Sequence, residues 1–303
     1  MSGSLPDGRA GGFLRGDVGV APRTDVPSLA ALLITRSLFT EALAAYCAEV
    51  TRPPDMSWPT NKVFGQSMRY IVCFDLIGNY ARWRRDGVEP PTLTALQRKV
   101  SASARQVASF VDALRHGGYV VAERGADRRS LHLRPSLTLL KEIARSPLAF
   151  LHASERILAG QDPLAHRIRN DEALLADWLG RAVERFHDED IYFSPFPTIV
   201  RLAEHDSGYP LLAAVMGANY AIRSGSTPCI LPLTYAALAE RFRVSRQHIG
   251  NLLIEAKQRD WFSVAHGGRS LVVSAGLVDE FERWSASQMA LYRTIAEEVT
   301  GRE

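Results

Sequence analysis

The chain repeats its own sequence pattern, and this feature constrains the fold more than any other. Short motifs of the first half recur in the same order in the second half, about 140 residues downstream each time. The recurring motifs are Trp58-Pro59-Thr60 with Phe196-Pro197-Thr198, Gly78-Asn79-Tyr80-Ala81 with Ala218-Asn219-Tyr220-Ala221, Thr92, Ala95, Leu96 and Ser103 with Thr234, Ala237, Leu238 and Ser245, and Arg129-Ser130-Leu131 with Arg269-Ser270-Leu271. Small changes in spacing between motifs are typical of a duplication followed by loop insertions. We therefore predict two copies of one structural unit within the 303 residues.

Each copy shows the same series of expected elements. A long amphipathic helix comes first, at 28–50 and 172–187, and a second helix follows at 66–85 and 209–223. A short helix, a tight turn, another helix, two short strands and a closing helix (136–158 and 277–298) complete the copy. The predicted organisation is a flexible N-terminal tail at 1–26, a first unit at 27–158, a linker at 159–170 and a second unit at 171–300.

In the second copy, residues 234–262 have the pattern of a helix-turn-helix. Ser245 is suited to cap the helix at 245–258, in which Ile249, Leu252, Leu253 and Ala256 form a buried stripe. The opposite face begins with polar residues that could reach base edges in a major groove, namely Arg246, Gln247, His248 and Asn251. The alternative is a pair of amphipathic helices with a solvated polar face. The coincidence of the small residue Ala239, the turn and the polar first turn favours a recognition helix.

Two short strands follow this helix, at 261–264 and 270–274. The residues between them end at Arg269, so the strands would form a hairpin with an arginine near its tip. Such a hairpin has the shape of a wing, whose arginine can reach phosphates or a narrow minor groove.

The first copy has the same plan, and its wing carries a resemblance to a known family. Its predicted recognition helix, 103–116, begins at Ser103 and presents Arg105, Gln106 and Ser109. Its wing contains Asp127, Arg128, Arg129 and Ser130 between two strands. This wing resembles that of the MarR family of regulators, the multiple-antibiotic-resistance type. The resemblance implies that Asp127 orients one arginine, while Arg128 or Arg129 enters the minor groove.

The chain departs from that family in its length. Family members are about half as long and act as homodimers whose first and last helices interlock. Here the two copies are expected to pack on each other through the helices at 28–50, 136–158, 172–187 and 277–298. The expected fold class is therefore mainly α with small β-wings, two winged helix-turn-helix domains forming a pseudo-twofold, MarR-dimer-like single chain. We expect it to act as a monomeric pseudo-dimer.

The two copies also differ from each other at the expected DNA contacts. Gly267 stands in the second wing where Asp127 stands in the first, which removes the orienting salt bridge. The first turns of the recognition helices differ as well. The expected partner is consequently double-stranded DNA with an imperfect inverted repeat, its half-sites about one helical turn apart.

Charge is concentrated locally, because the net charge of the whole chain is only +3. The basic residues around the first recognition helix are Arg98, Lys99, Arg105, Arg115, Arg124, Arg128, Arg129 and Arg134; those around the second are Arg241, Arg243, Arg246, Lys257, Arg259 and Arg269. We expect Arg105 and Arg246 to read bases. Arg128, Arg129 and Arg269 would mainly set affinity and its salt dependence.

Other functional classes find little support in the sequence. The eight histidines lack metal-ligand spacing, and neither a phosphate-binding loop nor a nucleophile elbow is present. We therefore expect no enzyme activity, no cofactor and no bound metal. Cys47 and Cys73 are expected in the core, and three widely spaced cysteines suggest a reducing cytoplasm. No apolar run has the roughly 20 residues of a membrane span, which predicts a cytoplasmic, nucleoid-associated protein without membrane contact.

The leading prediction is a bacterial-type, sequence-specific DNA-binding transcription regulator. One alternative is a plasmid-type replication initiator, which also carries two winged domains in one chain. Another is a winged-helix scaffold that binds proteins. In a regulator, the crevice between the long helices and the winged units is where a small-molecule effector would bind.

Overall fold

Helices dominate the part of the chain that the structure describes. The structure, a computed structural model, describes residues 25–52, 65–125, 130–159, 163–188, 195–224 and 232–301. Within these residues it contains thirteen α-helices and two separate two-stranded antiparallel sheets. The predicted mainly helical fold with two small β-hairpins is confirmed at this level.

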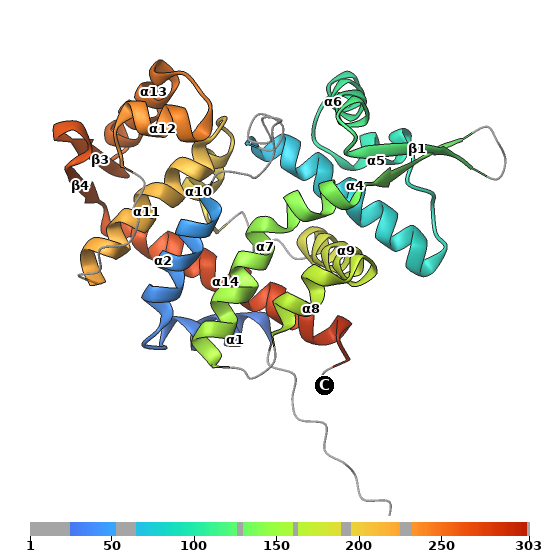
Figure 1. Cartoon of the computed structure of the whole chain (residues 1–303), viewed down its shortest axis with the longest axis horizontal. Helices are drawn as coiled ribbons and strands as arrows, with labels where there is room; N and C mark the ends of the chain where they lie inside the picture. The colour runs from blue at the N-terminus through green and yellow to red at the C-terminus, as the bar shows by residue number, and fades with distance from the viewer. Residues whose placement is uncertain are drawn as a thin grey trace, which may run out of the picture.

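From α4 and from α11 onward, the two halves share one order of elements, which is a long helix, two helices, a hairpin and a closing helix (Figure 1). The first half contains α1 (Val26–Ile34), α2 (Phe39–Val50), α4 (Ser67–Asp86), α5 (Leu93–Lys99), α6 (Ala104–His116), β1 (Val120–Arg124), β2 (Leu131–Pro135) and α7 (Leu137–Leu158). The second half contains α8 (Leu164–Asn170), α9 (Glu172–Asp188), α10 (Pro197–Ala203), α11 (Gly208–Ser224), α12 (Tyr235–Phe242), α13 (Arg246–Gln258), β3 (Phe262–Ala265), the 3₁₀ turn η1 (His266–Gly268), β4 (Ser270–Val273) and α14 (Ala275–Val299).

Equivalent helices of the two halves begin with the same type of cap residue. The pairs are Thr92 and Thr234 before α5 and α12, Ser103 and Ser245 before α6 and α13, and Ser136 and Ser274 before α7 and α14. In each case the hydroxyl oxygen accepts a hydrogen bond from the backbone N–H three residues later, at 3.1 or 3.2 Å. These bonds satisfy amide donors that the helix itself leaves unpaired, so the caps fix where each helix starts.

The two hairpins are attached to their neighbouring helices in the same way. Val120 of β1 lies opposite Pro135 of β2, and Phe262 of β3 lies opposite Val273 of β4. At the base of the first hairpin, the Ser136 N–H donates to the carbonyl oxygen of Tyr119 at 2.9 Å. The equivalent bond of the second hairpin, from Ser274 to Trp261, has the same length. Each hairpin is thus held to the start of its closing helix.

The helices of the two halves pack reciprocally. Helix α2 of the first half lies against α11 of the second, while α9 of the second half lies against α4 of the first. The closing helices α7 and α14 pack on each other in the middle of the molecule (Figure 1). Each half therefore supplies a helix to the other half's packing.

A continuous apolar core results from this exchange. The ring of Phe150 on α7 stacks on Tyr46 of α2 with a centroid separation of 3.9 Å, and it also lies 6.4 Å from the ring of Tyr292 on α14. Trp178 of α9 is fully buried and donates its indole N–H to the carbonyl oxygen of Tyr292 at 3.0 Å. Buried aromatic side chains from both halves thus share one core.

Small residues allow α4 and α9 to approach closely. A Cβ atom added to Gly180 of α9 would lie 2.3 Å from Cβ of Ala81, and one added to Gly78 of α4 would lie 2.6 Å from Val183 Cγ1. Real Cβ atoms do not approach other atoms this closely, so this crossing requires glycine at both positions.

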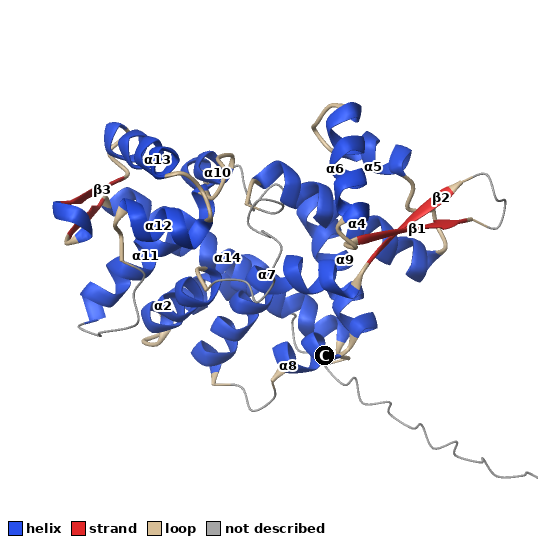
Figure 2. Ribbon diagram, turned by 45° about the horizontal axis from the view of Figure 1, so that its top comes forward, coloured by secondary structure: helices blue, strands red, loops and turns tan. Residues whose placement is uncertain are grey.

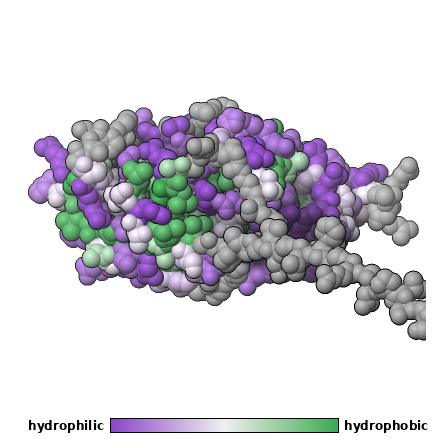
Figure 3. All heavy atoms as spheres, turned by 90° about the horizontal axis from the view of Figure 1, so that it is seen from below, coloured by the Kyte–Doolittle hydropathy of each residue, from purple (hydrophilic) through white to green (hydrophobic). Residues whose placement is uncertain are grey.

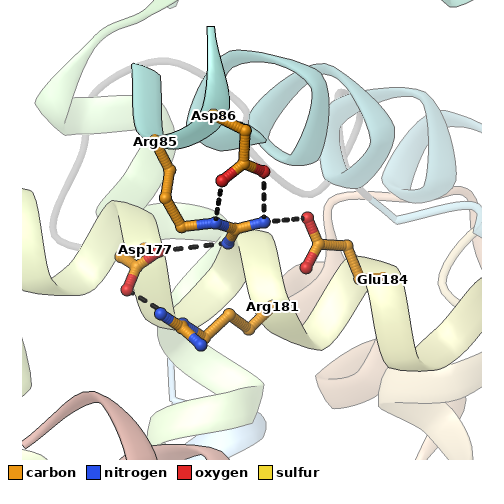
Figure 4. A network of polar contacts seen from close by, with 5 residues as sticks. All are labelled: Arg85, Asp86, Asp177, Arg181 and Glu184. Carbon is orange, nitrogen blue, oxygen red and sulfur yellow. Dashed lines mark hydrogen bonds and ion pairs between the residues drawn. The ribbon is translucent and has the colours of Figure 1, made fainter. Parts of the chain in front are cut away.

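An ion-pair network lies beside the same crossing (Figure 4). Arg85, near the end of α4, contacts Glu184 of α9 at 2.6 Å and Asp177 of α9 at 3.3 Å. Its guanidinium also pairs with Asp86, while Asp177 pairs with Arg181 at 3.0 Å. The network joins the two halves. The Arg85 side chain at its centre is largely buried, with 27% of its surface exposed.

Two expectations about the helices are corrected by the structure. The segment 28–50 forms two helices, α1 and α2, whose axes are bent by 103°. The reason is packing: α1 lies on α14, whereas α2 lies on α11 and α7, so one straight helix could not reach both neighbours. The segment 159–170, expected as a linker, contains helix α8, which packs on α7 and α9 and buries Leu164 and Ile168.

Among the described residues, no single helix has both the length and the apolar composition needed to cross a bilayer. Helices α1 and α2 have that length and composition only when taken together, and they are sharply bent against each other.

Candidate nucleic-acid interface

Helices α6 and α13 lie on the same side of the molecule, toward opposite ends of its long axis (Figure 1). Figures 1 and 2 show both helices along the upper side, with the β1–β2 and β3–β4 hairpins at the two outer flanks. The opposite face, seen in Figure 3, carries an apolar patch between polar regions. The exposed large apolar side chains of α1 and the turn after it are Leu32, Ile34 and Leu38.

Helix α6 presents the predicted polar face. Val107, Val111 and Leu114 are buried on its inner side, as predicted, while Arg105 and Ser109 are exposed. Arg105 makes no hydrogen bond or ion pair with any described residue, so its guanidinium is available to a partner.

Gln106 is exposed but already engaged in the helix cap. Its Oε1 accepts hydrogen bonds from the backbone N–H of Ser103 at 3.2 Å and from the Ser103 hydroxyl at 2.9 Å. The Ser103 hydroxyl in turn accepts from the Gln106 N–H, which completes a capping box. Ser103 and Gln106 therefore position the first turn of α6, and to contact a base either would first have to give up part of its cap.

Helix α13 presents three exposed polar residues in its first two turns. Arg246, Gln247 and Asn251 are exposed, and the predicted stripe of Ile249, Leu252, Leu253 and Ala256 is buried. Arg246 forms no ion pair within the described part of the chain. The Ser245 hydroxyl caps the helix by accepting from the His248 N–H.

His248 points away from this exposed face. Its Nε2–H donates to the carbonyl oxygen of Asp206, in the turn between α10 and α11, at 2.7 Å. The hydrogen bond fixes the ring against that turn, because a carbonyl oxygen can only accept. His248 was predicted to contact DNA directly; in the structure it instead anchors α13 to the neighbouring turn.

Glu255 provides a second anchor for α13. Its carboxylate lies 3.4 Å from Nε of Arg201 on α10, 3.1 Å from Nε of Arg259 and 3.2 Å from Nε2 of His205. Partial burial raises the pKa of this carboxyl, but the electrostatic attraction of His205 and the hydrogen bonds from Arg259 and Arg201 outweigh it, so the pKa of Glu255 is lowered. The charged form is the favoured one, and it joins α13 to α10.

Several basic residues near the two helices are paired internally. In the first half, Arg98 pairs with Glu89, Arg115 with Asp112, and Arg134 with Glu123. In the second half, Arg241 donates to the carbonyl oxygen of Thr51, and Arg259 pairs with Glu255 while lying over the ring of Trp261.

The remaining basic residues are exposed and have no partner within the described ranges. They are Lys99, Arg105, Arg124, Arg243, Arg246, Lys257 and Arg269. Arg124 and Arg243 were not predicted as contact residues. Arg243 could have been suspected, since it directly precedes the turn into α13 and has the left-handed backbone conformation of a helix C-cap, with φ of 54°.

The hairpin tips are described in part. Arg269 is exposed just after η1, as expected for a residue near the tip of the second hairpin. The tip of the first hairpin, residues 126–129, lies outside the described residues, and with it the expectations for Asp127, Arg128 and Arg129. Arg124, at the end of β1, is the described arginine nearest to that tip.

Within the described ranges, His, Cys, Asp and Glu side chains form no group of three or more that could hold a metal ion. Cys47 and Cys73 are buried in helices α2 and α4, as predicted, and burial raises the pKa of both thiols.

The site therefore consists of two capped helices on one side of a largely helical molecule, each with an exposed arginine in its first turn that has no partner among the described residues. Comparison with protein-family models, with curated proteins and with solved structures gave no significant match to this chain.

Proposed function

We propose that this protein is a sequence-specific, double-stranded DNA-binding transcription regulator. In this proposal α5–α6 with β1–β2, and α12–α13 with β3–β4, are two winged helix-turn-helix units of the MarR type. Helices α6 and α13 enter adjacent major grooves, and the hairpins reach the minor groove or the flanking phosphates.

The observation that carries the proposal is the pair Arg105 and Arg246. Both are exposed, both lie in the first turn of a helix capped by serine, and both helices lie on the same side of the molecule. An arginine at this place can donate two hydrogen bonds to O6 and N7 of a guanine, and the N-terminal end of a helix also favours the negative charge of DNA.

The reciprocal helix packing supports a pseudo-dimer within one chain. In this interpretation α2–α11 and α9–α4 are equivalent contacts related by a pseudo-twofold axis between the halves. The same axis would relate α6 to α13, so the two helices would address the half-sites of an inverted repeat.

The two half-sites are expected to differ. The first turn of α6 reads Ala104-Arg105-Gln106, whereas that of α13 reads Arg246-Gln247-His248. The arginine is the second residue of α6 but the first residue of α13. The third residue of α13, His248, is hydrogen-bonded to the turn between α10 and α11. An imperfect inverted repeat follows from these differences.

The experiment is affinity selection of genomic DNA fragments by the purified protein at two salt concentrations, followed by sequencing. The expected result is an enriched inverted repeat of unequal halves whose recovery falls steeply with salt. Recovery of random sequence at both salt concentrations would refute sequence-specific binding and direct attention to a protein-binding scaffold.

Variants then assign the helices to half-sites. Arg105→Ala should relax base preference in one half-site and Arg246→Ala in the other, each by about 1–3 kcal/mol of discrimination. Arg115→Ala is the matched control, since Arg115 lies at the far end of α6 and is paired with Asp112. If both first-turn variants select the same motif as the wild type, the proposed recognition is wrong.

A further inference from the structure

A cavity of about 220 Å³ lies between the two halves of the molecule. Its walls come from α2, α4 and α7 of the first half and from α9, α10, α11 and α14 of the second. The lining is mostly apolar and aromatic, with Phe74, Phe150, Phe186, Ile199 and Trp284 among its residues. A cavity of this composition favours a ligand with a large apolar surface.

Most polar side chains around the cavity already have partners. The hydroxyls of Ser146 and Tyr209 both bond to the hydroxyl of Tyr46. The Tyr70 hydroxyl donates to the carbonyl oxygen of Ile143 at 3.2 Å, and the Gln66 amide donates to the carbonyl oxygen of Glu204. These groups shape the walls and have little hydrogen-bonding capacity left for a ligand.

Gln288 of α14 is the exception. It is only 7% exposed, it lines the cavity, and its amide forms no hydrogen bond with any described residue. Trp284, one turn earlier on the same helix, also lines the cavity, and its indole N–H has no described partner. The Gln288 amide has both a donor and an acceptor that no described residue uses, so both are available to a ligand in the cavity.

The charges at the cavity exclude an ionic ligand. Its two charged lining residues have opposite signs: Glu142 and Arg145 lie 3.8 Å apart, and Arg145 also donates to the carbonyl oxygen of Arg52 at 2.9 Å. A charged molecule in the cavity would be desolvated without a counter-ion of its own. A neutral molecule avoids that penalty.

The volume limits the ligand to about two fused rings. An apolar cavity of about 150 Å³ accommodates benzene, so one of about 220 Å³ accommodates a bicyclic aromatic molecule. We propose that this cavity binds one neutral bicyclic aromatic lactam per chain, with the lactam C=O and N–H paired to the amide of Gln288. The proposal concerns this cavity alone and does not depend on whether the chain binds DNA.

The test is isothermal titration calorimetry of the full chain with 2-quinolinone, a bicyclic lactam, and with naphthalene, which has the same shape and no hydrogen-bonding group. The expected result is saturable binding of both molecules at one site per chain, with 2-quinolinone at least tenfold tighter. A stoichiometry other than one, or no saturable heat with either molecule, would overturn the proposal.

Two variants localise the binding. Gln288→Leu keeps a similar volume and should weaken 2-quinolinone at least tenfold while changing naphthalene affinity by less than about twofold, because only the lactam uses the amide. Ala203 lines the cavity, so Ala203→Phe places a ring inside it and should abolish binding of both molecules. Thermal unfolding checks that each variant is folded, and Gln288→Leu should melt no lower than the wild type, since the amide that it removes has no partner among the described residues. Equal 2-quinolinone affinity in the wild type and in folded Gln288→Leu would also overturn the proposal.

Discussion

Gly180 of α9 packs against Ala81 of α4 so tightly that a Cβ atom on Gly180 would lie 2.3 Å from Cβ of Ala81. This contact brings together helices from the two halves, and it makes the stability of the whole molecule sensitive to a single methyl group. It also distinguishes Gly180 from a helical glycine that has free space around it.

We predict that Gly180→Ala lowers the free energy of unfolding by about 1–3 kcal/mol, because the added methyl group forces α9 away from α4. Gly276→Ala is the matched control: Gly276 is also helical, and a Cβ atom there meets nothing within 4 Å. The control should be neutral or more stable by up to about 1 kcal/mol, the usual helix preference for alanine. Urea denaturation measures both, and the double variant Ala81→Gly/Gly180→Ala should recover part of the loss. Equal stability of the two single variants would contradict the close approach.

The ion network at Arg85 should contribute to the same helix pair. Arg85→Met is expected to lower the free energy of unfolding by about 1 kcal/mol at low ionic strength, since partly exposed pairs contribute modestly even in networks. The loss should shrink in 1 M salt, where the charges are screened. Arg115→Met, at the exposed pair with Asp112, should change stability by less than about 0.5 kcal/mol. A loss at Arg85 that is independent of salt would assign its effect to packing of the side-chain stem.

The pair Asp75 and His187 should make stability depend on pH. Asp75 is buried, its Oδ1 lies 2.5 Å from Nε2 of His187, and its Oδ2 has no partner among the described residues. Burial raises the pKa of Asp75 more than His187 and Lys99 lower it. The folded state therefore holds the proton more tightly than the unfolded state, and this carboxyl destabilises the fold as pH rises through its raised pKa.

Asp75→Asn should consequently be more stable than the wild type at pH 7.5, and the difference should disappear as pH falls to the ordinary range of aspartate, near pH 4. Denaturant titrations at several pH values measure this, with His187→Gln as the control that separates the histidine contact from burial. A variant less stable than the wild type at pH 7.5 would show that the contact with His187 outweighs desolvation.

The unpaired arginines outside the first turns should act on DNA affinity without affecting sequence preference. Arg124→Ala and Arg269→Ala are each expected to weaken binding to all sequences alike and to reduce the slope of log affinity against log salt by about 1. Arg156→Ala is the control, because Arg156 lies on α7 and pairs with Glu41. Fluorescence anisotropy with a selected and a scrambled duplex measures both effects. A change confined to the selected duplex would reassign these residues to base reading.

The sequence predicted those parts of the fold that local signals specify. The caps Ser103 and Ser245 and the buried stripes after them were readable because a cap residue and a helical period lie within one short segment. The bend between α1 and α2 was not readable, since the apolar residues on both sides of it fit one continuous helix. Only the positions of α14 and α11, both far along the chain, show why the helix must break.

The candidate site was predictable to a similar extent. Exposed Arg105 and Arg246 follow from their places opposite the buried stripes. The partner of His248 does not, because Asp206 is 42 residues away and offers a backbone carbonyl that no side-chain pattern reveals. The ion pair of Arg98 with Glu89 was not predicted either, although these two residues are close in sequence. Several nearby acidic residues could pair with Arg98, and only the folded geometry selects Glu89.

The reciprocal packing of α2 on α11 and α9 on α4 has a consequence for how such a molecule behaves when diluted. Two separate chains that exchange helices fall apart below their dissociation constant and can re-form with other partners. Here the exchanging helices belong to one covalent chain, so each always meets its partner at a high effective concentration. The packing of the two halves on each other is therefore independent of the concentration of the protein. A substitution in one half also leaves the other half unchanged, whereas in a homodimer it would occur in both subunits.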